Sequence, residues 1–472
     1  MILVIIGTPY YLGASVTSMQ PVSNDPSDPP NLNEKPYKHQ QYNFRIALAQ
    51  GVLIRISLAF AEPTTVLAVF IKRLTNNDLL VGVAGSIMTA GWMLPQLLVS
   101  NLIEHHPRKM PYYIIGMACR VTVWALICGA AHLIPVENAI LLATVVLALY
   151  FCASFSMGVS TLPYMDIISK SIPPNRRARF FSWRQLLGRF FEFLIGYFLI
   201  AYVLDQEKSG LVFPHNYALL FACTTIASLC AFLVFLKIRE PILPVRTERL
   251  SILDHLRKGP QILKTDPHYR RFLSFRICGH FVGASTPFYA TYALEIFPGA
   301  TESTAGHFLA TAAVSGIISN VFWRYLGERF GTRSILVVTG GLIGIPPLIA
   351  LTSSLMPVDQ QLNYYFLVYA IGGVSSNGIM VGFMTYALNI APGQSRPTYI
   401  GFMNTLLFPF AFVPLIGGAS LRFLSPWITI HHLFLVSAIS GILSFLMALR
   451  LEEVVRENED PLEDPITDKS RS

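Results

Sequence analysis

The chain contains 472 residues, of which 53% are hydrophobic and only 13% are charged. Soluble globular proteins contain about 25% charged residues, so the composition excludes that class and predicts an integral membrane protein. The formal net charge of +8 would suit nucleic-acid binding, but the basic residues gather in segments between apolar stretches. The charge therefore indicates how the chain is threaded through a membrane.

A helix that spans a bilayer requires roughly 20 apolar residues, and about twelve stretches of this sequence meet that requirement. They divide evenly around a polar centre, which predicts an all-α membrane protein made of two pseudo-symmetric six-helix bundles. The expected spans lie near residues 47–71, 80–103, 111–133, 139–162, 181–204, 217–237, 272–296, 303–325, 334–355, 364–388, 399–421 and 430–450.

The spans define the expected domains and connections. Leucines at helical spacing predict a short amphipathic helix in the central linker, on the membrane surface. Polar, proline-containing termini predict disordered tails. The apolar residues 1–14 before the first tail are interpreted either as a signal peptide or, at least as well, as a segment upstream of a true start at Met19. The expected order is a tail over residues 1–42, a first bundle over 43–238, a linker over 239–271, a second bundle over 272–451 and a tail over 452–472.

The connections that follow even-numbered spans are rich in basic residues, among them Lys170, Arg176 and Arg270. Because lysine and arginine are retained on the cytoplasmic side, this bias predicts that both termini are cytoplasmic. Lys72 and Arg73, after the first span, run against the bias, and we expect them to snorkel to the interface. The expected location is the inner (plasma) membrane, which the chain crosses many times.

Two basic loops resemble each other although they lie 219 positions apart. Residues 172–185 and 391–404 present proline, arginine, aromatic, small, aromatic and amide side chains in the same order. Each loop stands between two apolar stretches. The likeness predicts that one membrane unit occurs twice in the chain.

The connection after the eighth span, from Tyr325 to Arg333, reads Tyr-Leu-Gly-Glu-Arg-Phe-Gly-Thr-Arg. This segment, with twelve spans in two halves and a basic central loop, resembles the cytoplasmic signature of the major facilitator superfamily of secondary transporters. The resemblance covers roughly residues 42–451. It implies two bundles that rock around a site near the membrane midplane.

The resemblance also implies a cytoplasmic gate, in which glycines permit tight turns and charged side chains pair with one another and with helix ends. Such contacts form in one state and break in the other. The first-half loop, residues 101–109, keeps the acid and the basic end but lacks both glycines. The candidate gate residues are Glu104, Arg108, Lys109, Arg177, Gly327, Glu328, Arg329, Gly331, Arg333 and Arg396.

The fifth span departs from the superfamily's proton-driven drug exporters, which carry a glycine-rich proline motif there. Residues 185–196 contain Arg189 and Glu192 instead, and a similar motif occurs at residues 414–418 on the eleventh span. Drug export is therefore not the favoured interpretation.

Ionisable side chains inside the spans require an explanation, because each costs at least roughly 2.5 kcal/mol near the bilayer centre. Arg189 and Glu192 could equally form a buried pair that braces the first half. Arg55 could snorkel, and Arg276 is better explained as an interfacial anchor. The candidates for the transport path are Arg55, Glu62, Arg120, Arg189, Glu192 and His280.

Glu62 has no opposite charge near it in the sequence and is followed by Pro63, which interrupts a helix. A carboxylate buried without a partner can carry a proton through a transport cycle. An ion pair with Arg120 or Arg189 is an equally good alternative. In the second half, Asn320, Ser376 and Asn377 are candidate substrate contacts, with hydrogen bonding between helices as the alternative.

These features predict a secondary active transporter of a small solute, with protons as the candidate coupling ion and a monomer as the working unit. The chain contains no G-x-x-x-x-G-K-[ST] segment, and we expect neither an enzyme nor a cofactor, metal or nucleic-acid site. One alternative is a lipid-handling flippase of the same fold, whose cavity would be lined by basic groups. Another is a non-transporting membrane sensor or assembly factor.

Overall fold

The computed structural model describes residues 37–104, 106–242, 263–390 and 396–453. Most of the predicted tails and residues 243–262 of the predicted linker lie outside these ranges, so the expected disorder and amphipathic helix remain predictions. All regular structure in the described ranges is helical. The first helix begins at Gln40, inside the segment expected to be a tail.

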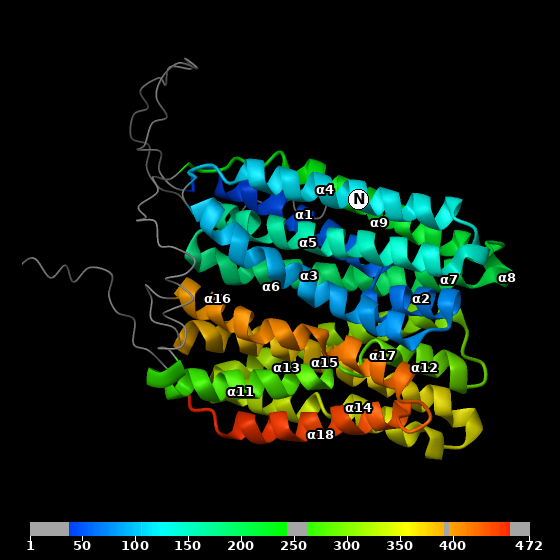
Figure 1. The fold of residues 1–472 in the computed structure, drawn as a ribbon. Helices are drawn as coiled ribbons and strands as arrows, with labels where there is room; N and C mark the ends of the chain where they lie inside the picture. The colour runs from blue at the N-terminus through cyan, green and yellow to red at the C-terminus, as the bar shows by residue number, and fades with distance from the viewer. Residues whose placement is uncertain (1–36, 105, 243–262, 391–395, 454–472) are drawn as a thin grey trace, which may run out of the picture. The chain divides into compact units, whose positions relative to one another are not determined.

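The first half of the chain forms long apolar helices joined by short turns, and Figure 1 shows them running side by side. We call the end of the molecule where α1 begins and α18 ends the terminal end, and the opposite end the far end. The elements are α1 (Gln40–Phe60), η1 (Pro63–Leu67), α2 (Ala68–Thr75), α3 (Asp78–Glu104), α4 (Met110–Leu133), η2 (Val136–Asn138), α5 (Ala139–Ser171), α6 (Pro174–Leu194), η3 (Ile195–Ile200), α7 (Ala201–Leu204), α8 (Gln206–Ser209) and α9 (His215–Phe235).

The second half repeats this arrangement. Its helices pack mainly on one another, as α13 does on α15 and α11 does on α18. The elements are α11 (Pro267–Val282), α12 (Phe288–Ile296), α13 (Glu302–Leu342), α14 (Ile345–Thr352), η4 (Ser353–Leu355), α15 (Val358–Ile390), α16 (Arg396–Leu407), η6 (Phe408–Phe412), α17 (Val413–Phe423) and α18 (Ile430–Leu449).

Ten helical stretches in the described ranges are long and apolar enough to cross a membrane. One of them, Glu302–Leu355, has 54 residues and would be roughly 80 Å long as a single helix, far more than the ~30 Å hydrocarbon core. It is broken at Gly331, whose φ is 80°. Trp323 and Thr339, on either side of this glycine, both lie against Gly378 of α15, so the chain folds back and crosses twice.

The seventh predicted span is not among the ten stretches, because it is divided into α11 and α12. The first span is interrupted at the corresponding place. Ala61 and Glu62 leave the helical conformation between α1 and η1, as residues 283–287 do between α11 and α12. With the divided seventh span and the folded-back stretch, the structure accommodates all twelve predicted spans.

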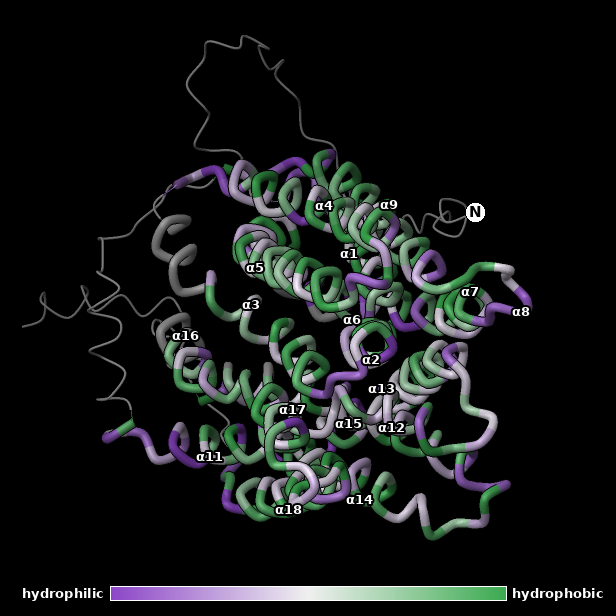
Figure 2. The backbone as a smooth tube through the Cα atoms, turned by 45° about the vertical axis from the view of Figure 1, so that its right-hand side comes forward, coloured by the Kyte–Doolittle hydropathy of each residue, from purple (hydrophilic) through white to green (hydrophobic). Residues whose placement is uncertain are grey.

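The outer faces of the helices are apolar, as the hydrophobic composition requires. Large side chains such as Ile115, Ile226, Ile318, Val321 and Ile416 are exposed. Figure 2 shows hydrophobic residues along the helices and hydrophilic residues at turns such as α8. Contiguous apolar exposure on this scale is not tolerated in water, so these faces contact lipid.

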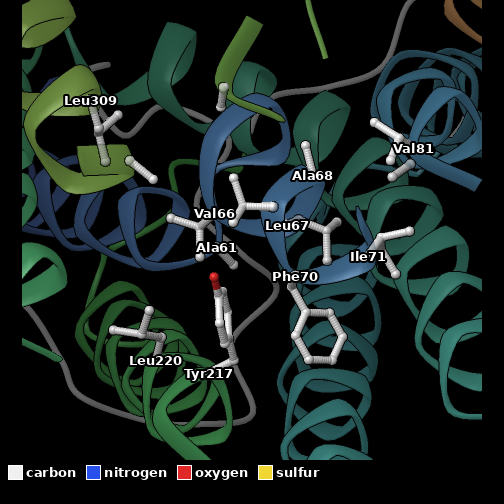
Figure 3. Packing of buried hydrophobic residues seen from close by; sticks show 14 of the residues in the cluster. Ala61, Val66, Leu67, Ala68, Phe70, Ile71, Val81, Tyr217, Leu220 and Leu309 are labelled. Atoms are coloured by element: carbon white, nitrogen blue, oxygen red, sulfur yellow. The ribbon is translucent and has the colours of Figure 1, made fainter. Parts of the chain in front are cut away.

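At the far end, the two halves share one apolar core. The cluster combines Phe70 and Tyr217 of the first half with Phe308 and Phe434 of the second. Figure 3 shows part of this cluster, in which Leu309 of α13 lies near residues of η1 and α2. The halves are therefore packed against each other at this end.

Glycines allow the halves to approach closely at the far end. A Cβ atom on Gly306 of α13 would lie 2.5 Å from the carbonyl oxygen of Gly196 in η3, and one on Gly82 of α3 would lie 2.5 Å from that of Pro414 in α17. Larger residues would push these helices apart.

Toward the terminal end, the halves have separate cores. Tyr113 and Phe235 belong to a cluster built from the first half, and Phe272 and Tyr386 belong to one built from the second half, which Met93 of α3 also joins. The described core is thus continuous across the halves at one end and divided at the other.

Candidate functional site

Glu62 lies at the interruption of the first span, where it caps the π-helical turn η1. Its Oε2 atom accepts hydrogen bonds from the backbone nitrogens of Thr64 and Thr65, at 2.8 and 2.7 Å, and from both hydroxyl groups, each at 2.9 Å. Pro63 starts the turn and has no backbone N–H to satisfy. The carboxylate therefore has local partners, and the ion pair with Arg120 or Arg189 is not formed in the described part of the chain.

Arginines of α1 and α6 pack against each other's glycines. The side chain of Arg55 on α1 lies over Gly188 of α6, and the side chain of Arg184 on α6 lies over Gly51 of α1. A Cβ atom at Gly188 would lie 2.9 Å from Cγ of Arg55, and one at Gly51 would lie 2.4 Å from Nε of Arg184. The two glycines leave room for two guanidinium stems between the helices.

Glu192 joins two of the predicted arginines. Its carboxylate lies 3.5 Å from Nη2 of Arg55 and 3.4 Å from Nη1 of Arg189. Glu192 is buried, with 6% of its surface exposed. The predicted pairing of Arg189 with Glu192 is therefore present, and Arg55 joins it instead of reaching the interface.

Arg189 also links the two halves. Its Nη2 atom donates to the hydroxyl of Ser376 on α15 at 3.3 Å, and its guanidinium lies beside Gly316 of α13. One turn earlier on α6, Gln185 Nε2 donates to Asn377 Oδ1 at 3.3 Å. These contacts connect the fifth span to the eighth and tenth near the middle of the molecule.

Two of the three polar candidates of the second half, Asn320 and Asn377, are hydrogen-bonded to each other. Asn377 donates to Asn320 Oδ1 at 2.8 Å and to the carbonyl oxygen of Gly316 at 3.0 Å. Asn377 has 1% of its surface exposed, so Asn320 and Asn377 also serve as the buried contact between helices that was the alternative interpretation. Ser376 faces the first half.

Arg120 lies deep inside the first half, away from these contacts. It has 2% of its surface exposed, and its Nε and Nη2 atoms have no hydrogen-bond partner among the described residues. The hydroxyl groups of Tyr113 and Tyr150 are close enough to interact electrostatically with its guanidinium group. Arg120 therefore contributes a buried, incompletely satisfied positive charge.

His280 and Arg276 occupy α11 in the second half. Arg276 stacks on the ring of Phe383, with 4.5 Å from its guanidinium carbon to the ring centre. Nε2 of His280 has no hydrogen-bond partner among the described residues. The structure does not bring His280 into the network around Arg189.

At the far end, Lys72 and Arg73 form ion pairs across the halves. Lys72 lies 2.6 Å from Asp78 of its own half and 2.9 Å from Glu295 of α12, and Arg73 pairs with Glu302 at the start of α13. Lys72, Arg73, Glu295 and Glu302 line a cavity of about 410 Å³. The expected snorkelling is thus replaced by pairing, which explains why two cations tolerate a position against the charge bias.

At the terminal end, the second-half gate motif is held by a carboxylate that lies beyond the last span. Glu453 accepts from the backbone nitrogens of Thr332 at 2.9 Å and Arg333 at 2.7 Å, and so caps the helix that restarts after Gly331. The guanidinium of Arg333 donates to the carbonyl oxygen of Leu449 at 3.1 Å.

The other motif residues of this loop make local contacts. Glu328 pairs with Arg324 on the same helix at 2.8 Å, and both side chains are exposed. Arg329 donates to the hydroxyl of Tyr325 at 2.6 Å. Gly327 lies against Ile335, where the chain folds back.

The first half repeats the carboxylate cap. Glu240, just beyond the sixth span, accepts from the backbone nitrogens of Lys109 at 2.7 Å and Met110 at 3.1 Å, at the start of α4. Arg177 donates to the carbonyl oxygens of Ser169 at 2.6 Å and Ile172 at 3.0 Å, at the end of α5. Both contacts satisfy helix ends.

For the three remaining gate candidates, the structure describes no contact that would hold a gate. Arg108 is exposed, in the turn before α4. The side chains of Glu104 and Arg396 lie outside the described part of the structure.

Sequence reasoning did not identify Gln185 as a site residue, nor Gly51, Gly188, Glu295 and Glu302. Gln185 stood in the repeated loop, where it was aligned with an amide of the second copy. The departure of Lys72 and Arg73 from the charge bias was the available signal for acidic partners nearby.

Comparisons with known proteins agree with this architecture. Residues 281–471 match the family model described as Major Facilitator Superfamily. The uncharacterized proteins Rv2209 of Mycobacterium tuberculosis and Mb2232 of Mycobacterium bovis are each 20% identical over 367 residues, which is 76% of this chain and 70% of theirs.

Solved structures share the fold over most of the chain. A D-xylose–proton symporter superposes with a TM-score of 0.65 at 13% identity, covering 89% of this chain and 99% of that one. A POT family transporter in complex with a thioalcohol-conjugated peptide superposes with a TM-score of 0.66 at 10% identity, covering 86% and 96%. In the family-model match over residues 281–471 and in the fold shared along both halves, the chain is similar to the major facilitator superfamily.

Proposed function

We propose that the chain is a secondary transporter that moves a small solute across its membrane by alternating access. The observation that carries the proposal is the difference between its two ends. Among the described residues, the halves share one apolar core at the far end, whereas toward the terminal end each half has its own core, and Met93 of α3 is the buried first-half residue that joins the second-half core. Two halves that are packed together at one end and divided at the other have the geometry expected of one state of a rocking pair.

The lysine and arginine bias supports a cytoplasmic position for the terminal end. In that orientation the structure corresponds to an inward-facing state, closed on the outside by the ion pairs of Lys72 and Arg73. We place the protein in the inner (plasma) membrane, as a monomer without a catalytic role.

A transport assay tests the proposal directly. The purified full chain, reconstituted in proteoliposomes, should exchange at least one solute from a library of small metabolites. Solutes that raise its unfolding temperature are tested first, because a ligand stabilises the state that binds it. If no solute crosses the membrane under any ion gradient, a sensor or assembly factor becomes the better interpretation.

Protons are the proposed coupling ion, and two structural neighbours are named as proton symporters, for D-xylose and for fucose. Glu62 remains the candidate proton carrier. Glu62→Gln keeps an oxygen that can cap η1 but cannot take up a proton, so uphill accumulation should stop while exchange continues. Glu137→Gln, at an exposed turn on the far end, is the matched control and should accumulate solute normally. Accumulation by Glu62→Gln at the wild-type level would exclude Glu62 as the carrier.

A further inference from the structure

The contact between α1 and α6 holds more positive than negative charge. Arg55, Arg184 and Arg189 lie along it, and Glu192 is the carboxylate that pairs with two of them. Glu62, the other acidic residue of these spans, accepts hydrogen bonds from Thr64 and Thr65 instead of pairing with an arginine. Two guanidinium groups therefore share one carboxylate, and the third, that of Arg184, lies over the ring of Tyr164.

The pairing that exists is loose. The distances of 3.4 and 3.5 Å between Glu192 and its two arginines exceed the roughly 2.7–2.9 Å of a good charge-assisted hydrogen bond. The Nε atoms of Arg55 and Arg189 are buried and have no hydrogen-bond partner among the described residues. The two guanidinium groups are thus only partly satisfied, and an anion that displaced Glu192 could make shorter hydrogen bonds with their outer nitrogens.

The positions of these arginines are built into the fold. Gly51 and Gly188 receive the side chains of Arg184 and Arg55, respectively, so the helices do not force the guanidinium groups out toward lipid. Arg55 keeps 27% of its side chain exposed, against 8% for Glu192. The Arg55 side chain is therefore less buried than the carboxylate with which it pairs.

Incompletely paired cations inside a membrane are costly. A ligand anion would offset that cost. Guanidinium groups match carboxylate and phosphate oxygens, to which they donate two parallel hydrogen bonds. A neutral sugar or a cation would leave the excess charge uncompensated.

We propose that the transported solute is an anion with a carboxylate or phosphate group, which binds Arg55 and Arg189. Ser376 of the second half, which already accepts from Arg189, completes the site from across the interface. The inference rests on the proposed transport function and names the substrate class of its central site.

Binding of a matched panel tests this class. The full chain in phosphatidylcholine nanodiscs is titrated with mono- and dicarboxylates and with sugar phosphates, each beside its uncharged amide or sugar. At least one anion should raise the unfolding temperature, and its neutral counterpart should not. Arg55→Gln and Arg189→Gln should weaken its binding by about 10- to 100-fold, the loss of a hydrogen bond to a charged group.

Two further variants show whether a loss of anion binding comes from the lost hydrogen bonds, from the lost positive charge, or from misfolding. Arg189→Lys keeps the charge but loses the paired donors, so its affinity should fall less than that of Arg189→Gln. Arg422→Gln removes the same charge from an exposed position at the end of α17 and should bind like the wild type. Equal affinity in the Arg55, Arg189 and Arg422 variants would overturn the proposal, as would an absence of response to every anion in the panel.

Further experiments distinguish a failure of the anion class from a failure of the proposed transport function on which it rests. Exchange of an uncharged solute in proteoliposomes, unaffected by Arg189→Gln, would support transport and overturn the anion class. An absence of flux for every solute would contradict the transport function itself. Stabilisation that occurs only when phosphatidylglycerol is added to the nanodiscs would assign the arginines to a lipid phosphate and contradict a soluble substrate.

Discussion

Neutralising two carboxylates at the far end should open that end of the molecule. Glu295 pairs with Lys72, and Glu302 pairs with Arg73, so both contacts join a helix of the first half to one of the second. The double variant Glu295→Gln and Glu302→Gln removes both pairs and leaves Lys72 with Asp78, its partner in the same half.

The structure sets the size of the effect. Exposed ion pairs contribute about 0.2–1 kcal/mol each, and these two are partly shielded, with exposed fractions of 13% and 48% for Lys72 and Glu295 and of 35% and 16% for Arg73 and Glu302. Loss of both should favour the open state by roughly 1–3 kcal/mol, which corresponds to a 5- to 150-fold change in the ratio of the two states. The shared apolar core opposes complete opening.

Distances between spin labels measure that ratio. The native cysteines are replaced, and cysteines at Val212 and Leu355, both exposed and on opposite halves at the far end, carry the labels. Double electron–electron resonance should show a longer-distance population that grows in the double variant.

Asp205→Asn provides the matched control, because Asp205 pairs with Lys208 inside the first half at the same end. This variant removes an acidic charge from the far end without breaking a contact between halves, so its distances should equal those of the parent. Unchanged distances in the double variant, or an equal change in the control, would show that these two ion pairs do not hold the far end closed.

Two predictions concern the terminal end. Glu453→Gln should lower the free energy of unfolding by roughly 0.5–2 kcal/mol, because it weakens the cap of the helix that follows Gly331. The control variant Glu328→Gln should leave the unfolding temperature unchanged. Equal effects of the two variants on the unfolding temperature would contradict the role of Glu453 as a cap. The hydrogen bond from Arg271 holds the pKa of Glu452 below its ordinary value of 4.5. This contact therefore stabilises the fold above that pH and is lost as the pH falls through the lowered pKa, so the difference in unfolding temperature between wild type and Arg271→Gln should shrink on acidification; a difference independent of pH would contradict it.

Hydropathy predicted the fold well because burial in lipid requires long apolar helices, whatever their partners. The turn between the eighth and ninth spans was placed correctly, and Gly331 lies in it. The interruption of the seventh span at residues 283–287 was not predicted, although these residues read Gly-Ala-Ser-Thr-Pro and include the glycine and proline that commonly interrupt a helix. In the first span, Pro63 signalled a local break but not that Glu62 would cap the turn after it.

The sequence predicted only those contacts of the site that join residues close together on one helix. Arg189 and Glu192 are three residues apart on one helix, and their pairing was expected. The hydrogen bonds from Arg189 to Ser376 and from Gln185 to Asn377 join residues 187 and 192 positions apart, and helical spacing carries no information on such pairs. The reciprocal packing of arginine on glycine was hidden for the same reason.

A bound anion must compete with Glu192 for Arg55 and Arg189, because this carboxylate is the group that pairs with both arginines. Glu192→Gln removes the competitor. Without ligand the variant should be less stable than wild type, since two buried guanidinium groups lose their charged partner. With ligand it should bind the anion more tightly, since no carboxylate has to be displaced first. Thermal unfolding measures the first effect and calorimetric titration the second. An affinity equal to that of wild type would show that Glu192 does not compete with the ligand.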